Sequence, residues 1–285
     1  MRRHSLLAPL LGMLLVVGLV GCSGGNRITH SGPEQAYNKG MTQYEEEDYD
    51  TAIRYFRAVF NYGRGNEWAP DAQYQLAKAY RKKGQYLVAA NEFKRFQQLY
   101  RNDPRVPRAE YEQARAYYSQ SPSYHLDQTH TRQAISLFQL FIDRHPNHEL
   151  VSDAESKIAE LREKLAHKKY DAAELYEQRR MWRAATETYK GVFDQYPDTK
   201  WADNALLGAV RSYVRYADRS IARKQDDRYQ QAIDYYTRLE QLFPNSPLLD
   251  EAQPLHAEAQ EKLEEVRQRQ ENQSLAQDGT SGDAR

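Results

Sequence analysis

Small and aromatic residues recur along this chain at a fixed spacing. Written as a repeat of about 34 residues, the pattern has a small residue at position 8, an aromatic at 11, alanine at 20, an aromatic at 24, an apolar residue at 27 and proline at 32. Five segments fit this pattern in register. The residues that carry it are Gly40, Ala52, Phe56 and Val59; Leu76, Ala77, Tyr80, Ala89, Phe93 and Phe96; Ala114, Tyr117, Ala134, Phe138, Phe141 and Pro146; Ala173, Tyr176, Ala185, Tyr189, Val192 and Pro197; and Leu207, Gly208, Ala232, Tyr236, Leu239 and Pro244.

The spacing has a mechanical explanation. Positions 8 and 20 are where two helices of a hairpin cross, so glycine or alanine is needed for the backbones to approach. The aromatic residues fill the remaining space, and proline ends the second helix. The pattern therefore predicts an all-α fold: a tetratricopeptide-repeat (TPR) solenoid of five helical hairpins with a C-terminal capping helix over 252–267. It also predicts one extended helix over 149–169 that leads into the fourth hairpin.

Two repeats carry insertions. The third is lengthened within 119–131 and the fifth around 215–229. Insertions in a solenoid fall in surface loops, often near a binding face. Neutral drift in length explains them equally well, and the sequence leaves both interpretations open.

The amino terminus predicts export and lipidation. Arg2 and Arg3 precede an apolar run over 5–20, which is typical of a secretory signal and short for a membrane-spanning helix. The run ends in Leu-Val-Gly-Cys22, a lipobox that contains the only cysteine of the chain. We expect a signal peptide over 1–21, acyl chains on Cys22 and a flexible tether over 22–33. An ordinary secretion signal followed by a stray thiol is the alternative, and the position of the single cysteine argues against it. The polar segment 268–285 is expected to be a disordered tail.

Charge and motifs argue against an enzyme and against a nucleic-acid binder. Acidic and basic residues are balanced at 40 each, so no basic excess marks nucleic-acid binding. Metalloprotease, phosphate-loop and nucleophile-elbow motifs are missing from the sequence, as is a set of cysteines and histidines at metal-ligand spacing. We expect no catalytic residue, no metal and no cofactor besides the lipid on Cys22.

The remaining candidate site is a surface that binds peptides. In TPR hairpins the first helix lines a concave groove, and tyrosines and cations fall at its groove positions. A tyrosine ring offers a large contact area and a hydroxyl that can bond a peptide backbone, and a cation can hold a carboxylate. The predicted groove residues are Tyr37, Tyr44, Tyr74, Lys78, Arg81, Tyr111, Arg115 and Tyr118. The other interpretation, that these rings pack one hairpin against the next, stays open.

Several segments resemble one family. They are the first repeat over 37–59 (YNKGMTQYEEEDYDTAIRYFRAV), LDQTHTRQA over 126–134, LREKLAHKKYDAA over 161–173, and YPDT over 196–199. Together with the lipobox and the five repeats, they resemble the BamD (ComL/YfiO-like) lipoproteins of the machinery that inserts β-barrel proteins into outer membranes. The loops that end the first two hairpins depart from the family pattern, which puts loop contacts in doubt.

The resemblance implies a location, a set of partners and a division of labour. The location would be the outer membrane, lipid-anchored and facing the periplasm. Repeats 1–3, over 34–146, would receive unfolded outer-membrane proteins or their terminal peptides. Repeats 4–5 and the cap, over 147–267, would dock the periplasmic domain of the barrel subunit BamA, and other Bam lipoproteins would be further partners. A pilotin-like lipoprotein that serves a secretin and a Tol-associated TPR lipoprotein remain alternatives.

Overall fold

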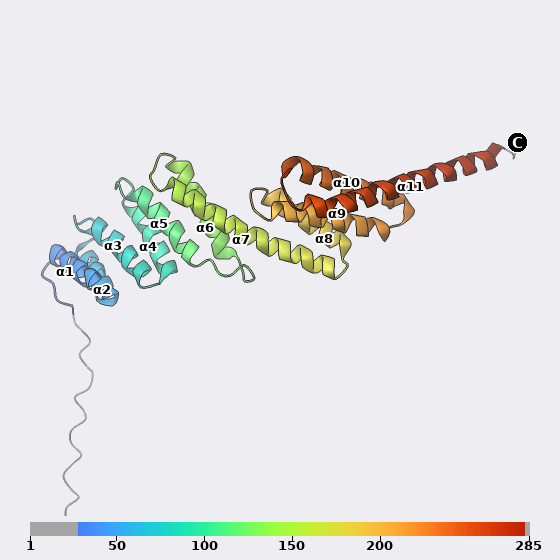
Figure 1. Cartoon of the computed structure of the whole chain (residues 1–285). Helices are drawn as coiled ribbons and strands as arrows, with labels where there is room; N and C mark the ends of the chain where they lie inside the picture. The colour runs from blue at the N-terminus through green and yellow to red at the C-terminus, as the bar shows by residue number, and fades with distance from the viewer. Residues whose placement is uncertain (1–27, 283–285) are drawn as a thin grey trace, which may run out of the picture. The chain divides into compact units, whose positions relative to one another are not determined.

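The computed structural model describes residues 28–282, and this whole range is built from helices and the turns between them (Figure 1). The signal peptide and the predicted lipidation site Cys22 lie outside the described residues. The chain divides into two compact units, with the boundary between Lys83 and Gly84. Each unit is described by itself, as unit 1 up to Lys83 and unit 2 from Gly84.

Unit 1 contains the first hairpin and one further helix. Its elements are α1 (Pro33–Glu45), α2 (Tyr49–Val59), the 3-10 turn η1 (Phe60–Tyr62) and α3 (Ala69–Lys82). Asp48 caps α2, because its carboxylate accepts a hydrogen bond from the backbone N–H of Thr51 at 3.0 Å. At the crossing of α1 and α2, a Cβ added to Gly40 would lie 2.7 Å from the wholly buried ring of Phe56. The requirement for a small residue at position 8 is therefore visible in this hairpin.

Unit 2 contains the remaining helices. They are α4 (Tyr86–Leu99), α5 (Val106–Ser119), α6 (Thr129–Arg144), α7 (Val151–Gln178), α8 (Trp182–Gln195), α9 (Ala202–Asp218), η2 (Ala222–Lys224), α10 (Gln225–Leu242) and α11 (Leu249–Gly282). Each α-helix packs against the next along the chain, and α11 also packs against α9. Buried aromatic and aliphatic side chains fill the interior; one cluster lies around Phe138 and Phe141 and another around Tyr189 and Leu206. The all-helical, sequentially packed architecture predicted from the pattern is confirmed.

Three helices of unit 2 end just before a proline. Helices α6, α8 and α10 each end two residues before a proline: Pro146, Pro197 and Pro244. The predicted extended helix is present as α7, which runs without a break into the first helix of the fourth hairpin. It therefore reaches Gln178 instead of ending near Lys169.

The two insertions have different structures. The third-repeat insertion is a turn between α5 and α6. The fifth-repeat insertion is mostly helical, because it lengthens α9 to 17 residues and α10 to 18 and leaves only 219–224 between them. The expectation of a surface loop therefore describes the third repeat better than the fifth.

The capping helix is longer than expected. Helix α11 packs through buried positions that include Ala252, Ala259 and Val266 and then continues to Gly282. Every side chain described beyond Val266 is exposed. The extra turns contain Gln, Glu, Ala and Leu, residues that favour helix without needing a packing partner. The structure thus extends a helix into the segment 268–285, for which the sequence predicted disorder.

The predicted division into halves at 146 and 147 falls inside unit 2. Helices α6 and α7 lie on either side of that point and pack against each other. The boundary between the two compact units lies between Lys83 and Gly84. As a division of function between substrate binding and docking, the two halves stay a prediction.

Candidate protein-binding surface

The predicted groove residues fall into one set in each unit. Tyr37 and Tyr44 lie on α1, and Tyr74, Lys78 and Arg81 lie on α3, all in unit 1. Tyr111, Arg115 and Tyr118 lie on α5 in unit 2. The two sets are described separately below.

In unit 1, the tyrosines of α1 meet residues of neighbouring elements. The ring of Tyr37 lies 6.0 Å from that of Phe56 and 5.3 Å from that of Trp68, measured between centroids. Tyr44 lies 5.5 Å from Tyr49, and the Lys78 ammonium of α3 lies 5.5 Å from the centroid of the Tyr44 ring. A cation over a ring at this distance is attracted by the negative face of the ring. The structure therefore brings Tyr44 and Lys78 together across α1 and α3.

Tyr74 and Arg81 complete the set in unit 1. They lie four residues before and three residues after Lys78 on α3, so that the three side chains share one face of the helix. Each of them is half-buried. This face carries one ring and two cations, and its role as a peptide groove stays a prediction.

In unit 2, the two tyrosines of α5 are tied to α7. Tyr111 is buried, with its ring 5.7 Å from the rings of Phe138 and Phe141, and its hydroxyl donates to the Asp153 carboxylate. Tyr118 is half-buried, and its hydroxyl donates to Glu160. These bonds give Tyr111 and Tyr118 a role in packing one hairpin on the next. Any role in a groove would be additional.

Both bonds keep the phenols protonated. Burial, reinforced by the bond to Asp153, raises the pKa of Tyr111 well above its ordinary value. The bond to Glu160, reinforced by burial, raises the pKa of Tyr118 to about 12. A neutral phenol next to a carboxylate remains a hydrogen-bond donor across the physiological pH range. Arg115, on the same helix, lies 3.6 Å from the Glu112 carboxylate.

Sequence reasoning missed the polar face of α7. Asp153, Lys157 and Glu160 follow one another at spacings of four and three residues, so they share one face of the helix. Lys157 lies 5.0 Å from the centroid of the Tyr118 ring, between the two acceptors of the tyrosine hydroxyls. This spacing was visible in the sequence, but nothing there indicated that the face meets α5.

The third-repeat insertion is held against the same helix. The Lys168 ammonium donates to the backbone carbonyls of Tyr124, His125 and Leu126 at 3.2, 3.0 and 3.0 Å. Inside the turn, the buried amide of Gln128 donates to two backbone carbonyls at 2.9 and 3.0 Å. These contacts fix the conformation of the turn.

An aromatic stack continues from this turn. The Tyr124 ring lies 3.7 Å from the His167 ring, and His167 lies 4.2 Å from Trp201 with an interplanar angle of 12°. Next to the stack, Leu126 is 60% exposed. The turn therefore presents an apolar side chain on a rigid base, as a surface that binds a partner would.

The residues described by the structure contain no group of three or more His, Cys, Asp or Glu side chains placed to hold a metal ion. Among the same residues, no helix is both long and apolar enough to cross a membrane.

Comparison with protein families identifies the chain. A family model described as "YfiO: Outer membrane lipoprotein" matches residues 30–227. The chain belongs to this family of outer membrane lipoproteins. The match covers α1 through α9, which includes every predicted groove residue.

Curated relatives carry the name outer membrane protein assembly factor BamD. The protein from Haemophilus influenzae is 28% identical over 224 residues, which cover 74% of this chain and 86% of the relative. The one from Rickettsia prowazekii is 28% identical, covering 76% and 88%. The one from Caulobacter vibrioides is 27% identical over 207 residues, covering 71% and 68%.

Solved structures of TPR proteins are also similar to the chain. A TPR-repeat protein from Bacteroides fragilis aligns with 82% of this chain and all of its own length, at 16% identity and a TM-score of 0.45. The TPR2AB domain of yeast Sti1 aligns with 80% of this chain and 98% of its own length, at 17% identity and a TM-score of 0.40.

Proposed function

We propose that this protein is an assembly factor for outer-membrane β-barrel proteins and works as a lipid-anchored subunit of a Bam-type complex. The observation that carries the proposal is the family match, which spans nearly all the hairpins of the chain. Relatives that are matched over most of their own length are named for the same activity. A scaffold of stacked hairpins suits this role, because it offers extended surfaces to several partners at once.

The proposed partners follow the division expected from the sequence. The C-terminal hairpins and α11 would dock the periplasmic domain of the barrel subunit BamA, and other Bam lipoproteins would bind elsewhere on the scaffold. The N-terminal hairpins would receive unfolded outer-membrane proteins.

Depletion of the protein in its host tests this function. We expect the amount of folded β-barrel proteins in the outer membrane to fall, measured by their heat-dependent mobility in gels, while other lipoproteins still reach the membrane. Replacement by a Cys22→Ala form should restore assembly poorly, because the protein would lose its anchor. Unchanged barrel levels after depletion would contradict the proposal.

The Tyr44–Lys78 contact gives the substrate groove its sharpest test. A peptide from the terminal strand of an outer-membrane protein would lie on the ring and place its terminal carboxylate near the cation. The variant Tyr44→Ala/Lys78→Gln should weaken peptide binding at least fivefold, which corresponds to about 1 kcal/mol. Tyr62→Ala is the matched control, because Tyr62 is an exposed tyrosine of the same unit outside the predicted set.

Fluorescence anisotropy of a labelled peptide measures the affinity, and circular dichroism checks that each variant is folded. If the double variant binds within twofold of the unmodified protein while Tyr62→Ala does the same, Tyr44 and Lys78 are not part of a peptide site. That result would leave the assembly function itself untouched.

A further inference from the structure

Two turns at one end of unit 2 carry basic side chains without any acidic residue among them. The turn between α7 and α8, together with the first two residues of α8, reads RRMWR over 179–183, and the turn between α9 and α10 reads RSIARK over 219–224. All six cations are exposed. They are Arg179, Arg180, Arg183, Arg219, Arg223 and Lys224. Within the part of the chain that the structure describes, their side chains form no hydrogen bond or ion pair.

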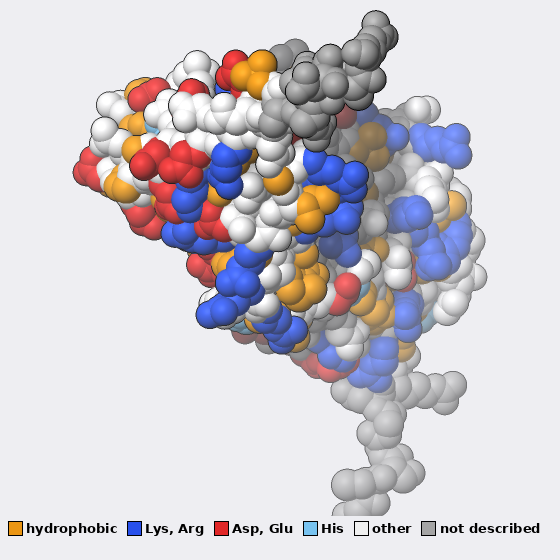
Figure 2. Space-filling view, turned by 90° about the vertical axis from the view of Figure 1, so that its right-hand side faces the viewer, with side chains coloured by type: hydrophobic (Ala, Val, Ile, Leu, Met, Phe, Trp, Pro, Cys, Tyr) orange, Lys and Arg blue, Asp and Glu red, His pale blue; other side chains and the backbone are white. Residues whose placement is uncertain are grey.

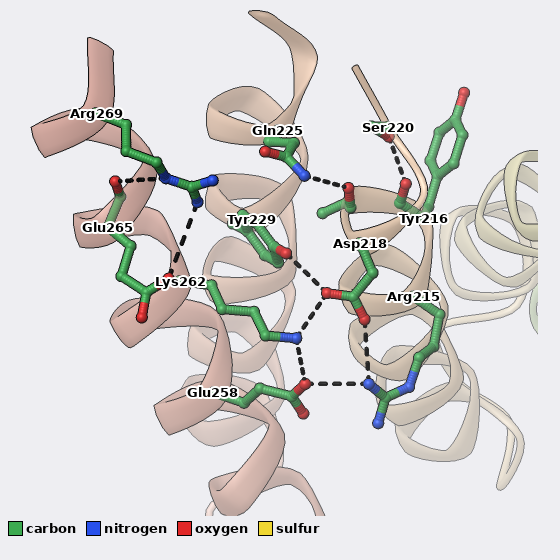
Figure 3. A network of polar contacts seen from close by, with 11 residues as sticks. Arg215, Tyr216, Asp218, Ser220, Gln225, Tyr229, Glu258, Lys262, Glu265 and Arg269 are labelled. Atoms are coloured by element: carbon green, nitrogen blue, oxygen red, sulfur yellow. Dashed lines mark hydrogen bonds and ion pairs between the residues drawn. The ribbon is translucent and has the colours of Figure 1, made fainter. Parts of the chain in front are cut away.

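Cations closer to the core of unit 2 are neutralised. Arg211 pairs with Glu177 at 2.5 Å, and Lys262 pairs with Asp218 at 2.6 Å. Figure 3 shows how Asp218, the carboxylate next to the second turn, is engaged at once by Lys262, Arg215 and the hydroxyl of Tyr229. Asp218 is therefore engaged by three partners, and Asp226 in the first turn of α10 pairs with Arg267 at 2.8 Å. Asp227, beside it, is exposed, so one carboxylate stands next to the three cations of the second turn.

The second turn projects beyond the first. Arg211 of α9 is level with Glu177, which lies one residue before the end of α7, because the two side chains are paired. Helix α9 continues for seven more residues to Asp218, and at 1.5 Å per residue this is about 10 Å. The lengthening by the fifth-repeat insertion thus carries 219–224 beyond the first turn, alongside α11, whose Lys262 is level with Asp218 and which continues to Gly282. The start of this turn is held in place, because Arg228 donates to the Ser220 hydroxyl and lies 3.6 Å from the centroid of the Tyr216 ring.

Apolar side chains lie among the cations. Met181 is 49% exposed in the first turn and Ile221 is 56% exposed in the second. Figure 2, which looks at the right-hand side of Figure 1, shows Lys and Arg side chains with hydrophobic ones between them, and a group of Asp and Glu side chains beside them. Cations without partners around a single apolar side chain suit an anionic surface that is soft enough for the apolar side chain to insert into it. A stable protein interface instead has a contiguous apolar centre with few charges.

We propose that these two turns, called the basic edge, bind the surface of an anionic phospholipid membrane. Membership in a family of outer membrane lipoproteins places such a surface next to the chain. The basic edge would then act as a second contact with the bilayer beside the lipid anchor, with Ile221 entering the headgroup region and the cations meeting lipid phosphates. A second contact of this kind would restrict how the C-terminal hairpins are oriented relative to the membrane.

The single cysteine of the chain allows a direct test. Because Cys22 is the only native cysteine and is the predicted lipid-carrying residue, an introduced cysteine is the one free thiol of the lipidated protein. The lipidated full chain carrying Ile221→Cys is labelled with a fluorophore and reconstituted into vesicles that contain nitroxide-labelled lipids. Vesicles of phosphatidylethanolamine and phosphatidylglycerol are compared with neutral phosphatidylcholine vesicles. Asn245→Cys is the matched control, because Asn245 is exposed in a turn at the opposite end of α10.

We expect lipid nitroxides to quench the label at position 221 in anionic vesicles, and to quench it much less at position 245 or in neutral vesicles. Arg219→Ser/Arg223→Ser/Lys224→Ser should lower the membrane-bound fraction of the edge about 10- to 100-fold at low salt, since each cation near such a surface contributes to binding. Circular dichroism confirms that the triple variant is folded. Equal quenching at positions 221 and 245, or quenching that is independent of lipid charge, overturns the proposal. It is also overturned if the triple variant labelled at position 221 is quenched as strongly as the protein that keeps the three cations.

Discussion

Gly208→Ala is expected to destabilise the protein even though alanine favours helix. Gly208 lies inside α9, and a Cβ at this position would lie 2.5 Å from Cζ of Tyr189. The Tyr189 ring is wholly buried, and its hydroxyl donates to Glu177 at 2.7 Å. Because Glu177 is also paired with Arg211, the ring cannot withdraw without disturbing that pair.

Two opposing effects set the size of the change. Replacing a helix-interior glycine by alanine gains about 0.5–1 kcal/mol through backbone entropy. Forcing a methyl group into a packed core costs about 1–3 kcal/mol, and the tethered ring places this site in the upper part of that range. We therefore expect a net loss of about 1–2 kcal/mol in the free energy of unfolding. For a chain of this size, that loss lowers the melting temperature by about 2–8 °C.

Gly191→Ala is the matched control. Its Cβ would also meet an atom at 2.5 Å, but that atom is Nζ of Lys169, the far end of a flexible side chain that can move aside. This variant should be neutral or slightly stabilised. Thermal and urea unfolding followed by circular dichroism measure both changes. If Gly208→Ala is as stable as Gly191→Ala, the close approach of α8 and α9 does not limit the residue at position 208.

Two further predictions concern contacts with α7. Lys168→Met keeps the aliphatic stem but removes the ammonium that holds three carbonyls, so amide exchange across 119–131 should accelerate about tenfold or more; unchanged exchange would show that the turn does not depend on this cation. Tyr118→Phe should cost about 0.5–1.5 kcal/mol at pH 8 through the lost bond to Glu160. Because the folded-state pKa of Tyr118 is raised to about 12 from an ordinary value of 10, this contribution is complete below pH 10 and is lost as the pH rises toward 12. Urea unfolding of the unmodified protein and of Tyr118→Phe between pH 8 and 11 measures this contribution. If the difference between their free energies of unfolding grows with pH, the hydrogen bond to Glu160 is not its source.

The helices of this chain were predictable because local packing requirements repeat. Gly40 and Gly208 occupy the small position of their repeats, and in both cases the structure places an aromatic ring where a Cβ would be. The prolines of the later repeats likewise follow the helix ends they were expected to cause. Gly40 meets Phe56 within the first hairpin, whereas Gly208 of α9 meets Tyr189 of α8 in the preceding hairpin. Both pairs occupy fixed positions of the repeat, so the sequence spacing contains the information.

Contacts between hairpins were harder to predict. The sequence predicts Tyr111 and Tyr118 as groove residues, but the partners of their hydroxyls lie on α7, 42 residues further along the chain. The spacing of Asp153 and Glu160 shows a polar face and does not show what the face meets. The register of one hairpin on the next decides that contact, and it depends on the packing of many side chains together.

The insertions show a similar limit. The repeat pattern predicts a surface loop for extra residues, but in the fifth repeat most of them form additional helical turns. The segment contains Ala, Arg, Lys and Gln, which are good helix formers. Their helix propensity favours added helical turns, whereas the repeat pattern indicates only that the repeat is longer. The unpaired cations of the basic edge became apparent only once the partners of the surrounding arginines were known.

Affinity purification from crosslinked, detergent-solubilised envelopes tests the central claim most directly. A tag placed after Arg285 lies beyond the packed part of α11, which ends at Val266. We predict that a β-barrel protein with repeated soluble periplasmic domains co-elutes in stoichiometric amount. Co-elution of a secretin or of Tol proteins, or of no membrane partner at all, would contradict the assignment to outer-membrane protein assembly.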